Sequence, residues 1–172
     1  MKTLYIVRHA KSSWDHPELD DSQRPLTEKG IKRTQLVINY LLANNVHVDL
    51  VLSSHAVRAH ETAKIIANSL QYPKDKIVIS EDIYFGSPDS FFDVLYGQEN
   101  GVDSLMMVGH NPGFTYFANY FLEQKIDNLP TSGIVGITFD TNSWENIANS
   151  GRRVKFVISP KSVRDTFSGN RN

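Results

Sequence analysis

The sequence predicts an α/β protein, a three-layer α/β/α sandwich with a mainly parallel central sheet and an antiparallel strand pair at its C-terminal end. Three observations support this fold class. Short apolar runs alternate along the chain with segments of helical periodicity, as in parallel sheets covered by helices. The apolar runs are continuous, which is typical of strands buried on both faces. A polar loop joins the last two runs, which favours antiparallel pairing.

The expected strands are short runs rich in apolar and β-branched residues. They cover residues 4–7, 50–52, 77–79, 104–108, 134–139 and 154–158.

Helices are expected between these strands. The first runs over residues 27–44, with Thr27 as its N-cap and Glu28 in the turn where the helix dipole favours an acid. Its predicted apolar face consists of Ile31, Ile38, Leu41 and Leu42. A clear i, i+3, i+4, i+7 pattern over residues 59–70 predicts the second helix. A third follows Pro88, and a fourth has Asn111 as its cap and Pro112 at its first position.

Length and composition indicate a single domain. The chain has 172 residues, of which 40% are hydrophobic and 22% charged, the usual balance for a globular protein. Residues 1–161 are expected to form one domain. The segment 162–172 carries few apolar residues and is expected to be a flexible tail.

Several functional classes are disfavoured by composition. There is no cysteine, and the net charge is −1, so neither disulfides nor a general attraction to nucleic acid or anionic membrane is expected. No apolar run approaches the roughly 18 residues of a membrane span, and the apolar N-terminus stops at Arg8. We therefore expect a cytoplasmic protein that needs no metal or other cofactor.

Polar residues follow three of the predicted strands. Arg8 and His9 end the first strand, Arg58 lies shortly after the second, and His110 follows the fourth. In an open α/β sheet, ligands bind beyond the carboxyl ends of the strands. Two arginines and two histidines should therefore meet at one edge of the sheet.

This set of side chains suits phosphoryl transfer. A transferring phosphoryl group needs its charge neutralised, and guanidinium groups match two phosphate oxygens. A neutral imidazole can attack phosphorus and form a phosphoramidate. Its other ring nitrogen then needs an acceptor such as a backbone carbonyl, while a second histidine donates to the non-bridging oxygens.

Each residue also has a simpler interpretation. Arg8 and His9 could be a surface pair, Arg58 a solvated helix residue, and His110 a turn residue. Arg24, before Pro25, is either a surface ion-pair partner or a substrate contact. His55 and His60 are five residues apart, which does not match the i, i+4 spacing of helical metal ligands. Three aromatic residues could line the pocket or belong to core or rim: Trp14, Tyr84 and Phe85.

Five segments carry a family resemblance in order along the chain: IVRHAKSSW from Ile6, RPLTEKG from Arg24, SSHAVRAHET from Ser53, GHNPG from Gly109 and TSGIVGI from Thr131. The chain resembles the histidine phosphatase superfamily, and within it the small SixA-type phosphohistidine phosphatases. The resemblance implies a phosphoglycerate mutase-like fold, with His9 as nucleophile. It further implies that Arg8 and Arg58 hold phosphate, that His110 completes the pocket and that Arg24 contacts substrate. The implied partner is a phosphohistidine-bearing protein or a small phosphoester, with inorganic phosphate as product.

The chain departs from the family pattern in two places. Ala10 stands where many members have glycine. Many members also carry a glutamate general acid after the third strand, where this chain reads Ile83-Tyr84-Phe85. Glu81 and Asp82 are the nearby candidates. A phosphoramidate has an easily protonated nitrogen leaving group, so the missing glutamate favours phosphohistidine over an alkyl phosphate.

Two further functions stay open at this point. One is a small-molecule phosphomonoester phosphatase or, with less support, a sugar-phosphate mutase. The other is a non-catalytic phosphoprotein-binding module. His9 and His110 argue against the second, since arginines alone would bind phosphate.

Overall fold

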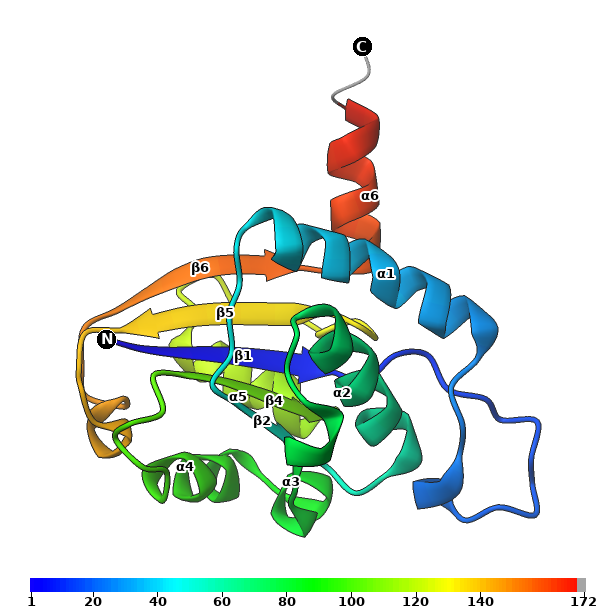
Figure 1. Cartoon of the computed structure of the whole chain (residues 1–172), viewed down its shortest axis with the longest axis horizontal. Coiled ribbons are helices and arrows are strands. Elements are labelled where there is room, and N and C mark those ends of the chain that lie inside the picture. Colours follow the sequence, from blue (N-terminus) through cyan, green and yellow to red (C-terminus); the bar gives the residue numbers. More distant parts are fainter. Residues whose placement is uncertain (170–172) are drawn as a thin grey trace.

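A six-stranded mixed sheet forms the centre of the molecule (Figure 1). The computed structural model describes the backbone of residues 1–169 and the side chains of residues 1–166. The strand order is β3-β2-β4-β1-β5-β6. Strands β3, β2, β4 and β1 are parallel, whereas β5 is antiparallel to both β1 and β6. The strands are β1 (Lys2–Arg8), β2 (Leu50–Ser53), β3 (Val78–Ile79), β4 (Ser104–Gly109), β5 (Ile134–Phe139) and β6 (Arg152–Ile158).

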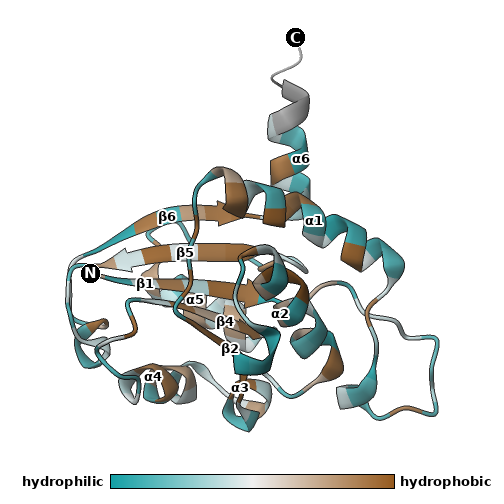
Figure 2. Cartoon of the chain, in the orientation of Figure 1, coloured by the Kyte–Doolittle hydropathy of each residue, from teal (hydrophilic) through white to brown (hydrophobic). Residues whose placement is uncertain are grey.

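Helices cover both faces of this sheet and complete the predicted sandwich. One face packs against α1 (Glu28–Ala43), α2 (Val57–Ser69) and α6 (Pro160–Gly169). The other packs against α3 (Glu81–Phe85), α4 (Pro88–Tyr96) and α5 (Gly113–Phe121). Figure 2 shows the hydrophobic colour concentrated on the central strands, with hydrophilic residues along the outer helices. The predicted fold class is confirmed.

Strand β1 shows why the apolar runs are continuous. Leu4 and Ile6 belong to the core cluster beneath α4 and α5, whereas Tyr5 and Val7 belong to the cluster beneath α1 and α2. Successive side chains of a strand point to opposite faces, so both sets must be apolar. Full burial of each such side chain contributes about 1.5–3 kcal/mol.

Helix α1 begins as predicted, but its buried face differs. The Thr27 hydroxyl accepts a hydrogen bond from the Gly30 backbone N–H at 2.9 Å, so Thr27 is the N-cap. Ile38 and Leu41 are buried, whereas Ile31 and Leu42 are nearly half exposed. The buried arc instead includes Gly30, Thr34 and Val37, which the apolar pattern alone did not reveal.

Two local features correct the predictions. Helix α3 was not anticipated, because it is only five residues long. Helix α5 begins at Gly113, with Pro112 as its N-cap residue and a cis peptide bond between Asn111 and Pro112. The Asn111 Oδ1 atom accepts hydrogen bonds from the backbone N–H and the hydroxyl of Thr115. Asn111 therefore stabilises the first turn of α5, although it lies one residue before the N-cap residue Pro112.

The C-terminal segment is helical where a flexible tail was expected. Helix α6 starts at Pro160, and the Ser159 and Ser162 side chains accept hydrogen bonds from each other's backbone N–H groups. Val163 is buried in the cluster shared with α1. The buried Val163 side chain therefore packs α6 against α1, and the Ser159 hydroxyl caps the start of the helix. Residues 170–172 of the predicted tail lie outside the described residues.

The strand ends establish where a ligand would bind. Strand pairing places Arg8 beside Gly109, and Ser53 beside Val108. A long loop follows β1 and extends beyond its arrowhead before entering α1 (Figure 1). Over the described chain, no helix combines the length and apolarity required to cross a membrane.

Candidate active site

The five predicted site residues line one cavity of about 270 Å³ at the carboxyl ends of β1, β2 and β4. The His9 backbone N–H bonds to the Gly109 carbonyl at 3.1 Å, and Ser54 N–H bonds to the Val108 carbonyl at 3.0 Å. The three chain segments are therefore tied together at the sheet edge. The cavity is lined by Arg8, His9, Lys11, Ser12, Trp14, Arg24, Arg58, His110, Asn111 and Thr131.

His9 is held in one tautomer. Its Nδ1 atom lies 2.7 Å from the Ala10 carbonyl oxygen. A carbonyl only accepts hydrogen bonds, so Nδ1 carries the proton and Nε2 keeps its lone pair. The Ala10 N–H in turn donates to the Thr62 hydroxyl at 2.9 Å. This chain of contacts fixes the imidazole ring.

Burial and positive neighbours keep His9 neutral. The residue is 7% exposed. Burial, opposed by the Ala10 hydrogen bond and assisted by the charges of Arg58 and Arg8, lowers the pKa of His9 to about 4. At neutral pH the imidazole is therefore unprotonated at Nε2, the form that can act as a nucleophile.

His110 lies directly beside His9. The two ring centroids are 5.2 Å apart. His110 Nε2 is 2.7 Å from the Ser54 hydroxyl, whereas its buried Nδ1 has no hydrogen-bond partner among the described residues. Burial, followed by the proximity of His9 and Arg58, lowers the pKa of His110 to about 3. This ring is also neutral at neutral pH.

The arginines each keep an unused donor. Arg8 Nη1 donates to the Leu129 carbonyl at 3.1 Å. Arg58 donates from Nη1 and Nη2 to the backbone carbonyl and carboxylate of Asp21, at 2.6 and 2.9 Å. Among the described residues, four buried arginine nitrogens lack hydrogen-bond partners: Arg8 Nε, Arg58 Nε, and Nε and Nη1 of Arg24. Buried donors of this kind are costly unless satisfied, and an oxyanion would supply the acceptors.

Asp21 connects the arginines and was not anticipated. Its carboxylate bonds to Arg58 and lies 3.3 Å from Arg24 Nε. It also accepts a hydrogen bond from the Tyr84 hydroxyl. That bond, followed by the Arg58 bond, lowers the pKa of Asp21 to about 2 despite partial burial. In the sequence, Asp21 is one of two adjacent acids, four and three residues before Arg24, and this spacing gave no indication of contact with Arg58.

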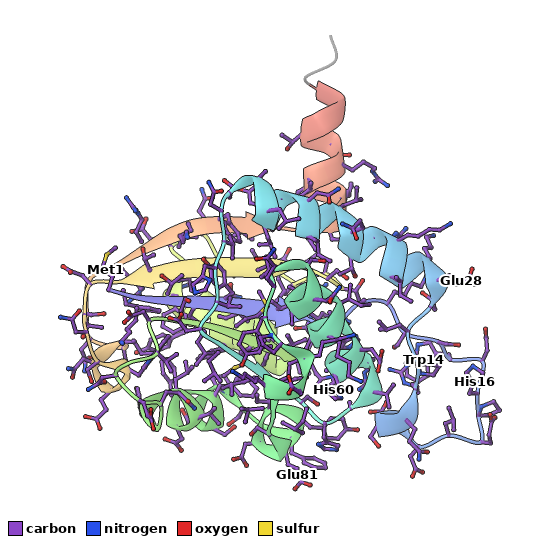
Figure 3. All side chains as sticks on the ribbon, viewed as in Figure 1. Met1, Trp14, His16, Glu28, His60 and Glu81 are labelled. Atoms are coloured by element: carbon purple, nitrogen blue, oxygen red, sulfur yellow. The ribbon has the colours of Figure 1, made fainter. Side chains whose placement is uncertain are left out.

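The aromatic residues have three different positions. Trp14 lines the cavity, 78% exposed, with the Arg24 guanidinium 3.5 Å above its ring centroid. Figure 3 shows Trp14 on the long loop beyond the sheet. Tyr84 lies edge-on to His110, with ring centroids 5.2 Å apart. Phe85, at the position where the family resemblance implies a glutamate, is 77% exposed.

Neither candidate general acid lines the cavity. Glu81 and Asp82 are exposed on α3, and Figure 3 shows Glu81 at the outer edge of the molecule. The nearest carboxylate to the arginines, Asp21, is already ionised and bound, so it has no proton to give. No carboxyl group belongs to the described lining of this cavity.

The histidines outside the cavity do not form a metal centre. His55 precedes α2 and packs against Tyr84, with ring centroids 4.7 Å apart. His60 lies within α2. Across the part of the chain that the structure describes, no three His, Cys, Asp or Glu side chains are grouped to hold a metal ion. The chemistry available to the site is anion binding by guanidinium groups around a neutral imidazole.

Comparison with known proteins agrees with this chemistry. Residues 4–86 match the model of the histidine phosphatase superfamily (branch 1). An uncharacterized protein of Picosynechococcus is 32% identical over 162 residues, which cover 92% of this chain and 96% of that protein. Phosphohistidine phosphatase SixA of Escherichia coli is 28% identical over 149 residues, covering 83% and 91% of the two chains.

The structural comparison extends over the same region. A solved structure of the protein histidine phosphatase SixA complexed with tungstate has a TM-score of 0.79 and 26% sequence identity. The match covers 94% of this chain and 99% of that chain. Family model, sequence relatives and fold therefore converge: this chain belongs to the histidine phosphatase superfamily and is a phosphatase of the SixA type.

Proposed function

We propose that the chain is a phosphohistidine phosphatase that acts on a phosphorylated protein through a covalent phosphohistidine on His9. The observation that carries this proposal is the His9 ring, whose protonated Nδ1 bonds to the Ala10 carbonyl while Nε2 stays unprotonated. That nitrogen is surrounded by three guanidinium groups with unused donors.

In the first step, His9 Nε2 forms a bond to the phosphorus of the substrate phosphohistidine. The P–N bond of the substrate breaks, and its imidazole leaves with a proton taken from solvent. Arg8, Arg24 and Arg58 offset the charge on the non-bridging oxygens as the group transfers. His110, hydrogen-bonded to Ser54, stands beside His9 to contact the same oxygens.

In the second step, water attacks the phosphorus of phosphorylated His9. The new P–O bond forms as the His9 P–N bond breaks. Inorganic phosphate leaves, and His9 returns to its starting state with Nδ1 still bonded to Ala10.

The substrate class follows from the leaving group. An alkyl alcohol leaves poorly unless a general acid protonates it, whereas the nitrogen of a phosphoramidate is protonated readily. The described lining of the cavity has no carboxyl group to serve as that acid. The SixA relative is named a phosphohistidine phosphatase, and SixA binds tungstate, a tetrahedral oxyanion like phosphate. The missing acid and the name of this relative favour a phosphohistidine substrate, whereas tungstate supports only the binding of a tetrahedral oxyanion.

Quenching a single turnover with alkali, which preserves a phosphohistidine, tests the intermediate. Enzyme mixed with a ³²P-labelled phosphohistidine protein should form a phosphoenzyme that is acid-labile and base-stable. The label should be absent in His9→Ala and present in His16→Ala, whose ring is exposed on the long loop. Turnover without a labelled enzyme, or labelling of His9→Ala, would refute His9 as nucleophile.

The rival substrate is a small phosphomonoester, which would fit in the 270 Å³ cavity. Comparing kcat/KM for a phosphohistidine protein with that for small alkyl and sugar phosphates separates the two. Faster hydrolysis of the esters would overturn the proposed substrate while leaving the His9 intermediate intact. Phosphate binding with no turnover of any donor would indicate a binding module.

A further inference from the structure

A second cavity adjoins the phosphate cavity and has a different chemical character. Its volume is about 290 Å³, and His110 and Asn111 line both cavities. No Lys, Arg, Asp or Glu side chain is among the described residues that line it. Its walls include Tyr84, Phe91, Pro112 and Tyr116.

The walls of this cavity are fixed at its base and open at its mouth. Phe91 is 1% exposed and packs edge-on against Phe114, with ring centroids 5.1 Å apart. Tyr84 is anchored by its hydrogen bond to Asp21. Tyr116, on α5, is 64% exposed. The cavity is therefore a preformed, neutral hollow with an exposed aromatic ring at its entrance.

We propose that this second cavity binds an apolar side chain next to the phosphohistidine of a protein substrate. The inference rests on the proposed function. A phosphoryl group between His9 and His110 lies one wall away from the hollow, since His110 forms part of both cavities. Neighbouring residues of a polypeptide are 3.8 Å apart at their Cα atoms. The side chain of a residue next to the phosphohistidine can therefore extend past His110 into the second cavity.

The chemistry of the walls selects the occupant. An uncharged aromatic and proline lining stabilises an apolar side chain and gives no counter-ion to a charged one. The leaving imidazole is bonded to phosphorus until the P–N bond breaks, so it stays next to the phosphoryl group and leaves the hollow for a flanking side chain. A small phosphoester has no flanking chain and would leave the second cavity empty.

Two phosphohistidine peptides test the proposal. They are identical except that the residues on both sides of the phosphohistidine are leucine in one and alanine in the other. We expect kcat/KM to be about tenfold higher for the leucine peptide, chiefly through KM, because burying the side chain adds binding energy. Phosphoramidate, which lacks flanking residues, serves as the reference substrate.

Four proteins complete the design: the unmodified chain, Tyr116→Ala, Tyr116→Phe and Tyr120→Ala. Tyr120 is a half-exposed tyrosine one turn further along α5 that does not line the cavity. Tyr116→Ala should abolish the leucine preference, whereas Tyr116→Phe and Tyr120→Ala should retain it. All four should hydrolyse phosphoramidate at the same rate.

Three outcomes would overturn the inference. Equal rates on the two peptides, or a preference that survives Tyr116→Ala, would show that this cavity does not select the flanking residue, with the proposed function still standing. Failure to cleave either peptide, with phosphoramidate still hydrolysed, would overturn the proposed protein substrate and this inference together.

Discussion

At the scale of single residues, the site depends on two imidazoles that stay neutral beside three arginines. Burial is the main cause for both His9 and His110, and the nearby positive charges act in the same direction. The Ala10 carbonyl then decides which nitrogen of His9 keeps the proton. Burial thus supplies the protonation state, and one backbone contact supplies the orientation.

The pKa of His9 should be measurable by NMR titration of its ring protons. We expect a midpoint near 4 in the free enzyme. In Arg58→Ala the pKa should rise, because removing a neighbouring positive charge favours the imidazolium ion. A midpoint in the ordinary range of about 6.5 would contradict this account of the nucleophile.

Removing the Asp21 carboxylate should impair catalysis without removing any phosphate ligand. Asp21→Ala frees the Arg58 and Arg24 guanidinium groups from their common anchor. Small misplacements of positioning groups cost up to about 100-fold in rate, so we expect kcat/KM to fall by about 10- to 100-fold. Asp15→Ala, an exposed change in the same loop, is the matched control and should have wild-type rates. Unchanged kinetics in Asp21→Ala would show that the arginines hold their positions without it.

At the scale of elements, the loop between β1 and α1 supplies Asp21 and Arg24 and must be held against the sheet edge. Thr27 N–H bonds to the Lys11 carbonyl at 2.9 Å, and Ser12 forms a bridge with Leu26. Gly30, in the first turn of α1, lets the Lys11 backbone approach closely. The start of α1 therefore holds both ends of this loop together.

A side chain at Gly30 should disturb that arrangement. A Cβ atom there would clash with the backbone oxygen of Lys11, only 2.4 Å away. Gly30→Ala should lower the unfolding free energy by about 1–3 kcal/mol and reduce kcat/KM as the loop shifts. Gly101→Ala is the control, since its Cβ atom meets nothing within 4 Å. Urea unfolding and steady-state kinetics on both variants test this; equal behaviour would contradict it.

Helices and strands with a strong local sequence pattern could be predicted. Those whose formation depends on contacts with residues far away in the chain could not. The apolar runs of β1 and β4 and the periodicity of α2 revealed these elements directly. Helix α3 is too short for a periodic signal, and its Ile83 is buried by contacts with the sheet. Helix α6 forms around Val163, whose partners lie in α1 and β6. A single valine between polar residues could not reveal that packing.

At the scale of the whole molecule, the buried imidazoles link stability to pH. The folded-state pKa values of His9 and His110 are about 4 and 3, below the ordinary value of 6.5. At pH values between the folded-state pKa of each ring and 6.5, that histidine binds a proton in the unfolded chain but not in the folded chain. Stability therefore falls as pH decreases from about 6.5 towards 4, by up to about 1.4 kcal/mol per pH unit for each ring.

Urea unfolding at pH 6.5 and pH 5 should show this loss of stability. The double variant His9→Asn/His110→Asn removes both titrating rings, so its stability should depend less on pH over the same interval. Equal pH dependence in the two proteins, or greater stability at pH 5, would contradict the linkage.

The order of apolar runs and the positions of Arg8, His9, Arg58 and His110 were enough to predict the sheet, its helical layers and the residues at its edge. These features depend on local pattern and on the rule that parallel strands end together. The role of Asp21, the neutral state of both imidazoles and the second cavity beside His110 depend instead on contacts between residues far apart in the chain. Burial and charge proximity exist only after folding, so they could be learned only from the tertiary structure.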